Sequence, residues 1–209
     1  MEITLAILSG VFWSLTYILI IVRGFKDKTF GMPLVALCAN ISWEFIFSFI
    51  YPSPPPQVYI NITWFLLDAV IVFQIFYFGK SVFADLLPKG SFIPLFLLSL
   101  ILSFVLILNI SAELDNYHAK YAAFGQNFIM SVLFVFMLLR RNDLKGQSIY
   151  IALFKMIGTV LPSILFYTNY PALALLNTLY IAIFIFDALY LVMLYAKHKE
   201  LGINPWKRI

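Results

Sequence analysis

The chain alternates between long apolar segments and short polar ones. Each apolar segment has about 20 residues, which as an α-helix spans the roughly 30 Å hydrocarbon core of a bilayer. Charged or Pro- and Gly-rich segments separate them, among them PSPPPQ, SAELDNYH and RRNDLKGQ. This pattern predicts membrane-spanning helices over residues 3–22, 33–51, 60–79, 92–110, 119–139, 149–168 and 172–196.

The composition supports a membrane protein. Of the 209 residues, 63% are hydrophobic and only 11% are charged, which is more apolar than a soluble domain of this size can bury. We therefore predict an all-α polytopic protein whose residues 1–209 form a single seven-transmembrane-helix bundle. The predicted connections are short, so any chemistry is expected between the helices. The only cysteine, Cys38, lies in an apolar segment, which excludes an intrachain disulfide.

Lysine and arginine alternate between the two predicted sides of the membrane. One side has a single basic loop residue, Lys120. Cytoplasmic loops are enriched in these residues, so the N-terminus is predicted outside or in a lumen and the C-terminus in the cytoplasm. The net charge of +4 is spread between apolar blocks, and no nucleic-acid partner is expected. The basic residues of the other side are Arg23, Lys26, Lys28, Lys80, Lys89, Arg140, Arg141, Lys145, Lys197, Lys199, Lys207 and Arg208.

Three acidic residues fall inside predicted spans. Glu44 lies in the second, Asp68 in the third and Asp187 in the seventh. A charged group near the middle of a bilayer is costly, and such residues usually face the bundle interior and serve a pathway, a proton relay or a site. All three lie within about two helical turns of the expected midplane, so we expect them to share one cavity.

Other polar and aromatic residues are expected to line the same cavity. Several follow the acids at helical spacing, and others form polar stripes on the first, fifth and sixth spans. These candidates are Trp13, Tyr17, Asn40, Trp64, Gln126, Asn127, Lys155, Thr159, Ser163, Tyr167, Tyr180 and Tyr190.

Structural roles are open for part of this set. Gln126, Asn127, Thr159 and Ser163 are residue types that form hydrogen bonds between membrane helices without any catalytic role. Lys155 can instead extend its ammonium toward the membrane surface, because it lies near one end of its span. Asp68 can be a structural hydrogen-bonding partner.

A carboxyl group in a low-dielectric site favours its neutral form, which makes Glu44 a candidate proton donor. If Glu44 and Asp187 approach each other, they are expected to share one proton. Surrounding aromatic faces can stabilise a developing cation, as a terpene-cyclising site requires. The sequence has no HExxH, GxSxG, DDxxD or DxDD motif, no Cys/His cluster and no central lysine in the seventh span. Neither a metal, nor another cofactor, nor retinal is therefore expected.

Three motifs resemble a known family. GMPLVALCANISWEF follows a basic FKDKTF turn, GQN lies in the fifth span and FDALY in the seventh. With the seven spans, the chain resembles the integral membrane terpene cyclases of meroterpenoid and indole-terpenoid biosynthesis, which occur in fungi and bacteria. The resemblance covers essentially the whole chain, and the second-span motif is its most specific part.

The resemblance implies a function. In that family a Glu of the second-span motif and an Asp of the seventh span are implicated in protonating an epoxide or olefin, which starts a metal-free cyclisation. The matching residues here are Glu44 and Asp187, and the resemblance adds Trp43 to the cavity lining. The implied substrate is a lipophilic prenylated small molecule that enters from the membrane lipid.

Two other functions fit an intramembrane polar cavity. A proton-coupled small-molecule transporter also uses buried acids and Pro-interrupted helices, although inverted repeats are expected there and none is evident. A ligand-sensing seven-helix receptor is disfavoured by the short loops and by the lack of an output domain.

Overall fold

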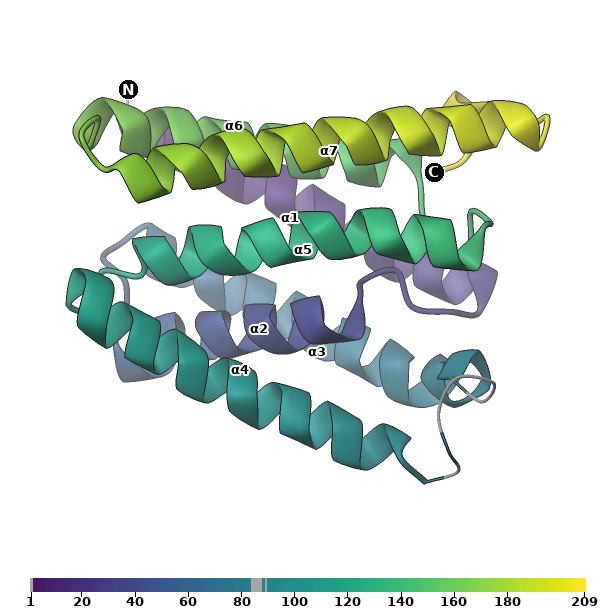
Figure 1. The fold of residues 1–209 in the computed structure, drawn as a ribbon, viewed down its shortest axis with the longest axis horizontal. Coiled ribbons are helices and arrows are strands. Elements are labelled where there is room, and N and C mark those ends of the chain that lie inside the picture. Colours follow the sequence, from purple (N-terminus) through teal and green to yellow (C-terminus); the bar gives the residue numbers. More distant parts are fainter. Residues whose placement is uncertain (1, 84–87, 89) are drawn as a thin grey trace.

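The structure, a computed structural model, describes residues 2–83, 88 and 90–209, with the backbone only at residues 80 and 81. The described residues form helices that lie side by side, and they contain no strand (Figure 1). In chain order the elements are α1 (Glu2–Asp27), α2 (Leu34–Phe45), the π-helix η1 (Ile46–Ile50), α3 (Gln57–Phe83), α4 (Phe92–Asp115), α5 (Lys120–Arg141), α6 (Ile149–Asn169), α7 (Ala174–Glu200) and the 3₁₀ turn η2 (Pro205–Lys207).

Each predicted span coincides with a helix. The helices are longer than the predicted spans at several ends; α1 continues to Asp27 and α7 to Glu200. Among the described residues, six helices are long and apolar enough to cross a membrane, namely α1, α3, α4, α5, α6 and α7. The second apolar unit, Leu34–Ile50, is shorter. The all-helical, multi-pass architecture is confirmed, whereas a span at this second unit stays a prediction.

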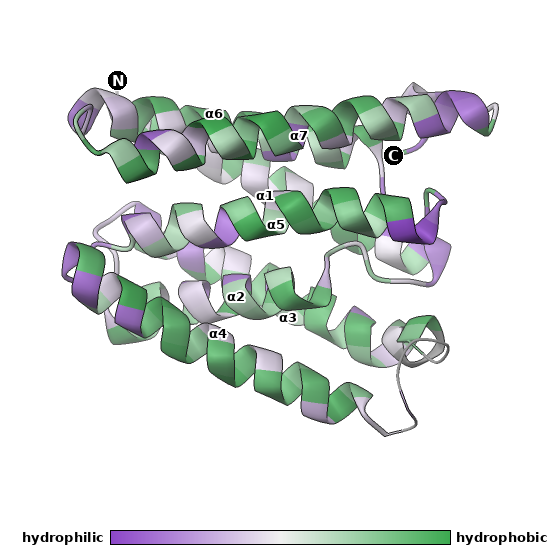
Figure 2. Ribbon diagram, viewed as in Figure 1, coloured by the Kyte–Doolittle hydropathy of each residue, from purple (hydrophilic) through white to green (hydrophobic). Residues whose placement is uncertain are grey.

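The helices are arranged around α2. Helix α1 packs against α3 and α6, α7 packs against α6 and α5, and α2 packs against α3, α4 and α5. Apolar residues cover most of the length of the helices, and polar residues gather toward their ends (Figure 2). Many large apolar side chains on the outside, such as Leu66, Leu102 and Ile181, are exposed. This exterior is the surface expected to contact lipid.

The second apolar unit consists of helix α2 and a π-helical turn. It begins directly after Pro33, and it buries Ala36, Leu37 and Cys38 in its first turns. It then continues into η1, where the backbone N–H of Tyr51 donates to the carbonyl of Ile46 at 2.8 Å. Single π turns within α-helices are frequently found at functional sites.

The basic loops gather at one end of the bundle. The Asp27 carboxylate accepts hydrogen bonds from Arg208 at 2.7 Å, from the Gly146 N–H at 2.8 Å and from Arg23. These bonds join the end of α1 to the α5–α6 loop and to the C-terminal segment. Segments that are joined in this way must lie on the same side of the membrane. Of the basic residues used to predict orientation, Lys89 and the side chain of Lys80 lie outside the described residues.

Close packing of α1 on α6 depends on Gly158. A Cβ atom at this position would lie 2.8 Å from Cδ1 of Trp13. Gly158→Ala is therefore expected to displace the indole and to destabilise the fold by about 1–3 kcal/mol. Thermal unfolding in detergent micelles measures the effect, and Gly125→Ala in α5 is the matched control because its Cβ would meet no atom within 4 Å. Equal unfolding temperatures for the two variants would show that this contact does not limit the packing.

Candidate active site

Three helices each contribute a pair of side chains to a buried cluster around Glu44. The two members of each pair are four residues apart, so they lie on one face of their helix. We call this the Glu44 cluster; it consists of Trp13 and Tyr17 from α1, Asn40 and Glu44 from α2, and Trp64 and Asp68 from α3.

Asn40 joins the polar members of this cluster. Its Nδ2 donates to Oε1 of Glu44 at 2.9 Å and to Oδ2 of Asp68 at 2.7 Å, and it also contacts the Tyr17 hydroxyl. Tyr17 in turn donates to Oε1 of Glu44 at 2.8 Å. Both carboxyl groups are fully buried. The cluster therefore fixes the two acids from three helices with neutral donors.

Glu44 and Asp68 lie close together, because the same Asn40 nitrogen donates to both carboxyl groups. Two buried carboxylates that share one donor, with no cation in the cluster, repel one another, so one shared proton favours the arrangement. Neither Oε2 of Glu44 nor Oδ1 of Asp68 accepts from a described donor. These two oxygens are consequently the positions at which the cluster can carry an acidic proton.

Three aromatic rings surround the acids. The ring centroids of Trp13 and Tyr17 are 5.9 Å apart, those of Tyr17 and Trp64 are 6.2 Å apart, and those of the two tryptophans are 6.4 Å apart. The Trp64 N–H donates to the Ser14 hydroxyl at 3.2 Å, which holds the indole on α1. Such rings offer their negative faces to a cation without adding a competing nucleophile.

A second polar cluster lies between α5, α6 and α7, and we call it the Lys155 cluster. The ammonium of Lys155 is 2.6 Å from Oδ1 of Asp187 and 2.6 Å from the hydroxyl of Ser131. Asn127 accepts from Lys155 at 3.4 Å and donates to Thr159 at 3.0 Å. Lys155 and Asp187 are both buried, so this ion pair is shielded from water.

A cavity of about 390 Å³ borders this cluster between α6 and α7. Asp187, Thr159, Ser163 and Tyr180 supply polar groups to a wall that is otherwise mostly apolar. Neither Oδ2 of Asp187 nor the Tyr180 hydroxyl has a described hydrogen-bond partner. The cavity can therefore accept an oily molecule and still offer hydrogen bonds to a polar group on it.

Trp13 connects the two clusters. Its ring belongs to the Glu44 cluster, and the ammonium of Lys155 lies 5.7 Å from its centroid. Among the described residues, the donors to the Glu44 carboxyl are Tyr17 and Asn40, and no contact joins it to Asp187. Asp187 instead binds Lys155, because α7 packs against α5 and α6 and not against α2.

Other predicted residues also lie in the interior but in different places. Trp43 packs on Phe47 and donates to the Ala119 carbonyl at 3.3 Å, in an apolar group against which Trp64 of the Glu44 cluster packs. Tyr190 donates to Gln147 at 3.1 Å toward the basic end. The Oε1 atom of Gln126 has no described partner. Lys155 does not extend to the membrane surface, because Asp187 and Ser131 hold its ammonium inside the bundle.

Two contributors were missed by the sequence analysis. Ser131 contacts Lys155, and it lies four residues after Asn127 on the same face of α5, a spacing that could have identified it. The Phe134 ring lies 5.9 Å from the same ammonium. No sequence signal separates this phenylalanine from the many that pack or face lipid.

Comparison with known proteins identifies the family of this chain. A model of the family of Pyr4-like transmembrane terpene cyclases matches residues 1–200. The chain belongs to this family. The match includes every residue of both clusters, so the buried acids and the aromatic rings lie in the region that defines the Pyr4-like cyclases.

Several members of the Pyr4-like family are similar along most of this chain. The Pyr4-family terpene cyclase mfmH of Annulohypoxylon moriforme is 35% identical over 190 residues, which are 87% of this chain and 78% of the relative. Asnovolin H synthase nvfL of Aspergillus novofumigatus is 29% identical and covers 75% of this chain. Terpene cyclase andB of Emericella variicolor is 29% identical and covers 73%. The chain spans 66% of the length of each of the last two.

The buried ion pair predicts a non-additive effect on stability. Lys155→Met leaves Asp187 without its partner and is expected to destabilise the protein by about 3–5 kcal/mol, because an unpaired buried charge is costly. The double variant Lys155→Met/Asp187→Leu removes both charges and is expected to recover most of the loss. Thermal unfolding of the two single variants, the double variant and the wild type measures this coupling. Losses that simply add would contradict a direct ion pair.

Proposed function

We propose that this protein is a membrane-embedded terpene cyclase that uses an acid and no metal. It would protonate an epoxide or olefin of a lipophilic prenylated substrate and so trigger cation-olefin cyclisation. The observation that carries the proposal is the Glu44 cluster, in which a buried carboxyl pair lies beside the Trp13, Tyr17 and Trp64 rings. Membership of the Pyr4-like family supports it.

Glu44 is the proposed general acid, and Asp68 shares its proton. The Glu44–Asp68 pair donates that proton to the epoxide oxygen, the adjacent C–O bond breaks and the oxygen becomes a hydroxyl. With an olefin, the proton adds to carbon instead. An epoxide requires a weaker acid than an alkene, so a carboxylic acid suits it better. Tyr17 and Asn40 donate to Oε1 of Glu44, and they stabilise the charge left on the acid after transfer.

The cation produced in this step is attacked by successive double bonds, which close the rings. The aromatic faces of Trp13 and Trp64 stabilise the migrating positive charge, and the apolar interior excludes water that would otherwise trap it. The final cation loses a proton to a base, and the Glu44–Asp68 pair takes up a proton again before the next turnover. Substrate and product are then isomers, so the reaction balances without an oxidant, a reductant or a second substrate.

Asp187 is the proposed base or electrostatic stabiliser of the last cation. The Lys155 ammonium lies 2.6 Å from Oδ1 of Asp187, and the free Oδ2 borders the α6–α7 cavity. A carboxylate in this place can attract a cation and accept a proton. This role replaces the proton sharing with Glu44 that the sequence suggested.

The α6–α7 cavity is the proposed binding site for the polar end of the substrate. Its volume of about 390 Å³ and its mostly apolar lining suit a prenylated ring system. The Tyr180 hydroxyl and the free oxygen of Asp187 offer a donor and an acceptor to a hydroxyl on that ring. The prenyl chain would then extend past Trp13 toward Glu44.

Removal of the acid is the direct test of this mechanism. Glu44→Gln is expected to reduce cyclisation by about 100-fold or more, because general acid catalysis contributes roughly 10²–10⁴-fold. Asp68→Asn is expected to reduce it less, since Glu44 keeps an ionisable carboxyl. Membranes containing each variant are incubated with prenylated and epoxyprenylated phenols, and the products are identified by mass and by ring structure.

Two controls accompany this experiment. Glu113→Gln changes an exposed carboxyl outside both clusters and is expected to keep wild-type turnover. Asp187→Asn is expected to lose cyclised product, and its folded fraction in membranes is measured alongside because Lys155 loses its partner. Wild-type turnover by Glu44→Gln would remove the proposed acid, and wild-type turnover by Asp187→Asn would remove the proposed base.

The proposed orientation places the basic end of the bundle in the cytoplasm. The described basic segments are joined there through Asp27, and cytoplasmic loops are enriched in Lys and Arg. A protease site added after Ile209 is expected to be cut by added protease, without permeabilisation, in sealed vesicles whose cytoplasmic face is outward. Cleavage in cytoplasm-out vesicles supports the orientation, and protection in them reverses it.

A further inference from the structure

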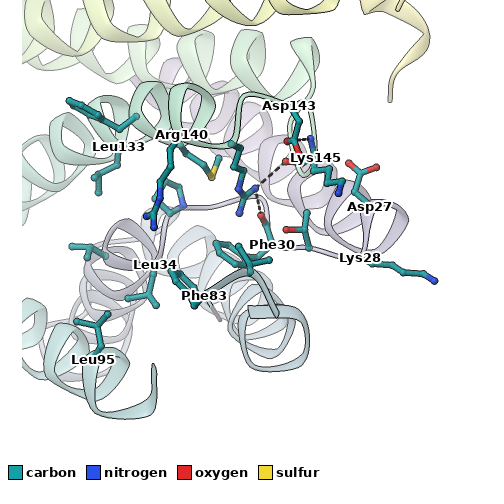
Figure 3. A pocket seen from close by; sticks show the side chains of 17 residues that line it. Asp27, Lys28, Phe30, Leu34, Phe83, Leu95, Leu133, Arg140, Asp143 and Lys145 are labelled. Carbon is teal, nitrogen blue, oxygen red and sulfur yellow. Dashed lines mark hydrogen bonds between the residues drawn. The ribbon is translucent and has the colours of Figure 1, made fainter. Parts of the chain in front are cut away.

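The larger described cavity lies away from both clusters. It is a crevice of about 780 Å³ at the basic end, between the loop after α1, the start of α2, the ends of α3 and α5, and α4. We call it the basic crevice (Figure 3). None of the acids proposed for catalysis lines it.

The inner part of the basic crevice is apolar and open to the membrane. Leu34, Phe83, Leu95 and Leu133 form its walls (Figure 3). Leu95 and the further lining residues Val35 and Phe136 are exposed on the outside of the bundle. A hydrocarbon chain could thus enter sideways from the bilayer without crossing a polar barrier.

The rim of the crevice has an excess of positive charge. It carries Lys28, Arg140, Arg141 and Lys145 against the carboxylates of Asp27 and Asp143. Asp27 is already engaged by Arg23 and Arg208, so it does not neutralise the rim.

The cations of the rim have different roles. Arg141 is committed to structure, because it donates to the carbonyls of Phe30 at 2.9 Å and Lys145 at 3.0 Å and stacks on the Phe30 ring. Arg140, Lys28 and Lys145 have no acidic partner among the described residues. Arg140 extends from α5 over the mouth on the side of Leu34, whereas Lys28 points outward (Figure 3).

We propose that the basic crevice binds an anionic phospholipid. Its headgroup phosphate contacts Arg140 and Lys145 at the rim, and one acyl chain lies against Leu34, Leu95 and Leu133. Basic pockets between transmembrane helices on the cytoplasmic side are suited to anionic headgroups, which are abundant in that leaflet. Arginine and lysine both bind phosphate, the former with two donors in a fixed plane.

This site would be separate from cyclisation. The bound lipid would bridge α5, α2 and α4 at the end of the bundle where the loops are joined through Asp27. It does not depend on the proposed reaction, because its ligand makes no contact with Glu44 or Asp187. Binding of the lipid therefore has a readout of its own.

The probes are spin-labelled phosphatidylglycerol and spin-labelled phosphatidylcholine, added to the whole protein in phosphatidylcholine vesicles. The fraction of each probe that is immobilised by the protein is measured. Wild type is expected to immobilise phosphatidylglycerol preferentially, and Arg140→Gln/Lys145→Gln is expected to weaken this preference by about tenfold or more. Lys199→Gln/Lys207→Gln removes two cations outside the crevice and is expected to keep the preference.

Two further measurements test the proposal if Arg140→Gln/Lys145→Gln does not fold. Leu95→Trp fills the crevice without changing its charge and is expected to release the immobilised lipid. Unlabelled phosphatidylglycerol is expected to compete with the probe, and a prenyl carboxylic acid at the same concentration is not. Equal immobilisation of both probes by wild type would overturn the proposal. So would a stronger competition by the prenyl acid, which would identify the crevice as a site for substrate-like amphiphiles.

Discussion

The fold depends on how ionisable groups are satisfied inside a bundle that excludes water. An unpaired charge there costs several kcal/mol, so every acid needs a donor or a cation from another helix. Tyr17 of α1 meets this need for Glu44, Asn40 of α2 meets it for Asp68, and Lys155 of α6 meets it for Asp187. Each of these contacts joins different helices. The polar groups that suit catalysis are therefore also the groups that determine which helix faces meet.

The two clusters use opposite electrostatic solutions. Around Glu44 the donors are a neutral amide and a phenol, and a second carboxyl is adjacent, so holding a proton is favoured. Around Asp187 the partner is a buried ammonium at 2.6 Å. A carboxyl group thus has neutral donors in one cluster and a cation in the other, and such different environments allow two acids to take different roles.

Sequence periodicity was sufficient for the helices and for the choice of interior acids. It could not decide which acids meet, because that depends on the order of helices around α2 and on how each helix is rotated. Asp68 and Asp187 are both spaced as interior residues, but α3 packs against α2, whereas α7 packs against α5 and α6. Tyr190 follows Asp187 by one turn, but that turn already brings it to Gln147 at the basic end. Spacing along the sequence determines which side chains share a helix face, and tertiary packing determines which other helix that face contacts.

Separation of the clusters is itself required by the proposed chemistry. If Glu44 lay beside Lys155, the ammonium would favour loss of the Glu44 proton before substrate arrived. The Trp13 indole contacts Tyr17 of the Glu44 cluster, and its centroid lies 5.7 Å from the Lys155 ammonium of the other cluster. Gly158 leaves the room for that indole. The proposed proton donor and the proposed base therefore lie in separate clusters of one apolar bundle, and an aromatic ring that contacts both clusters lies on the path proposed for the cation.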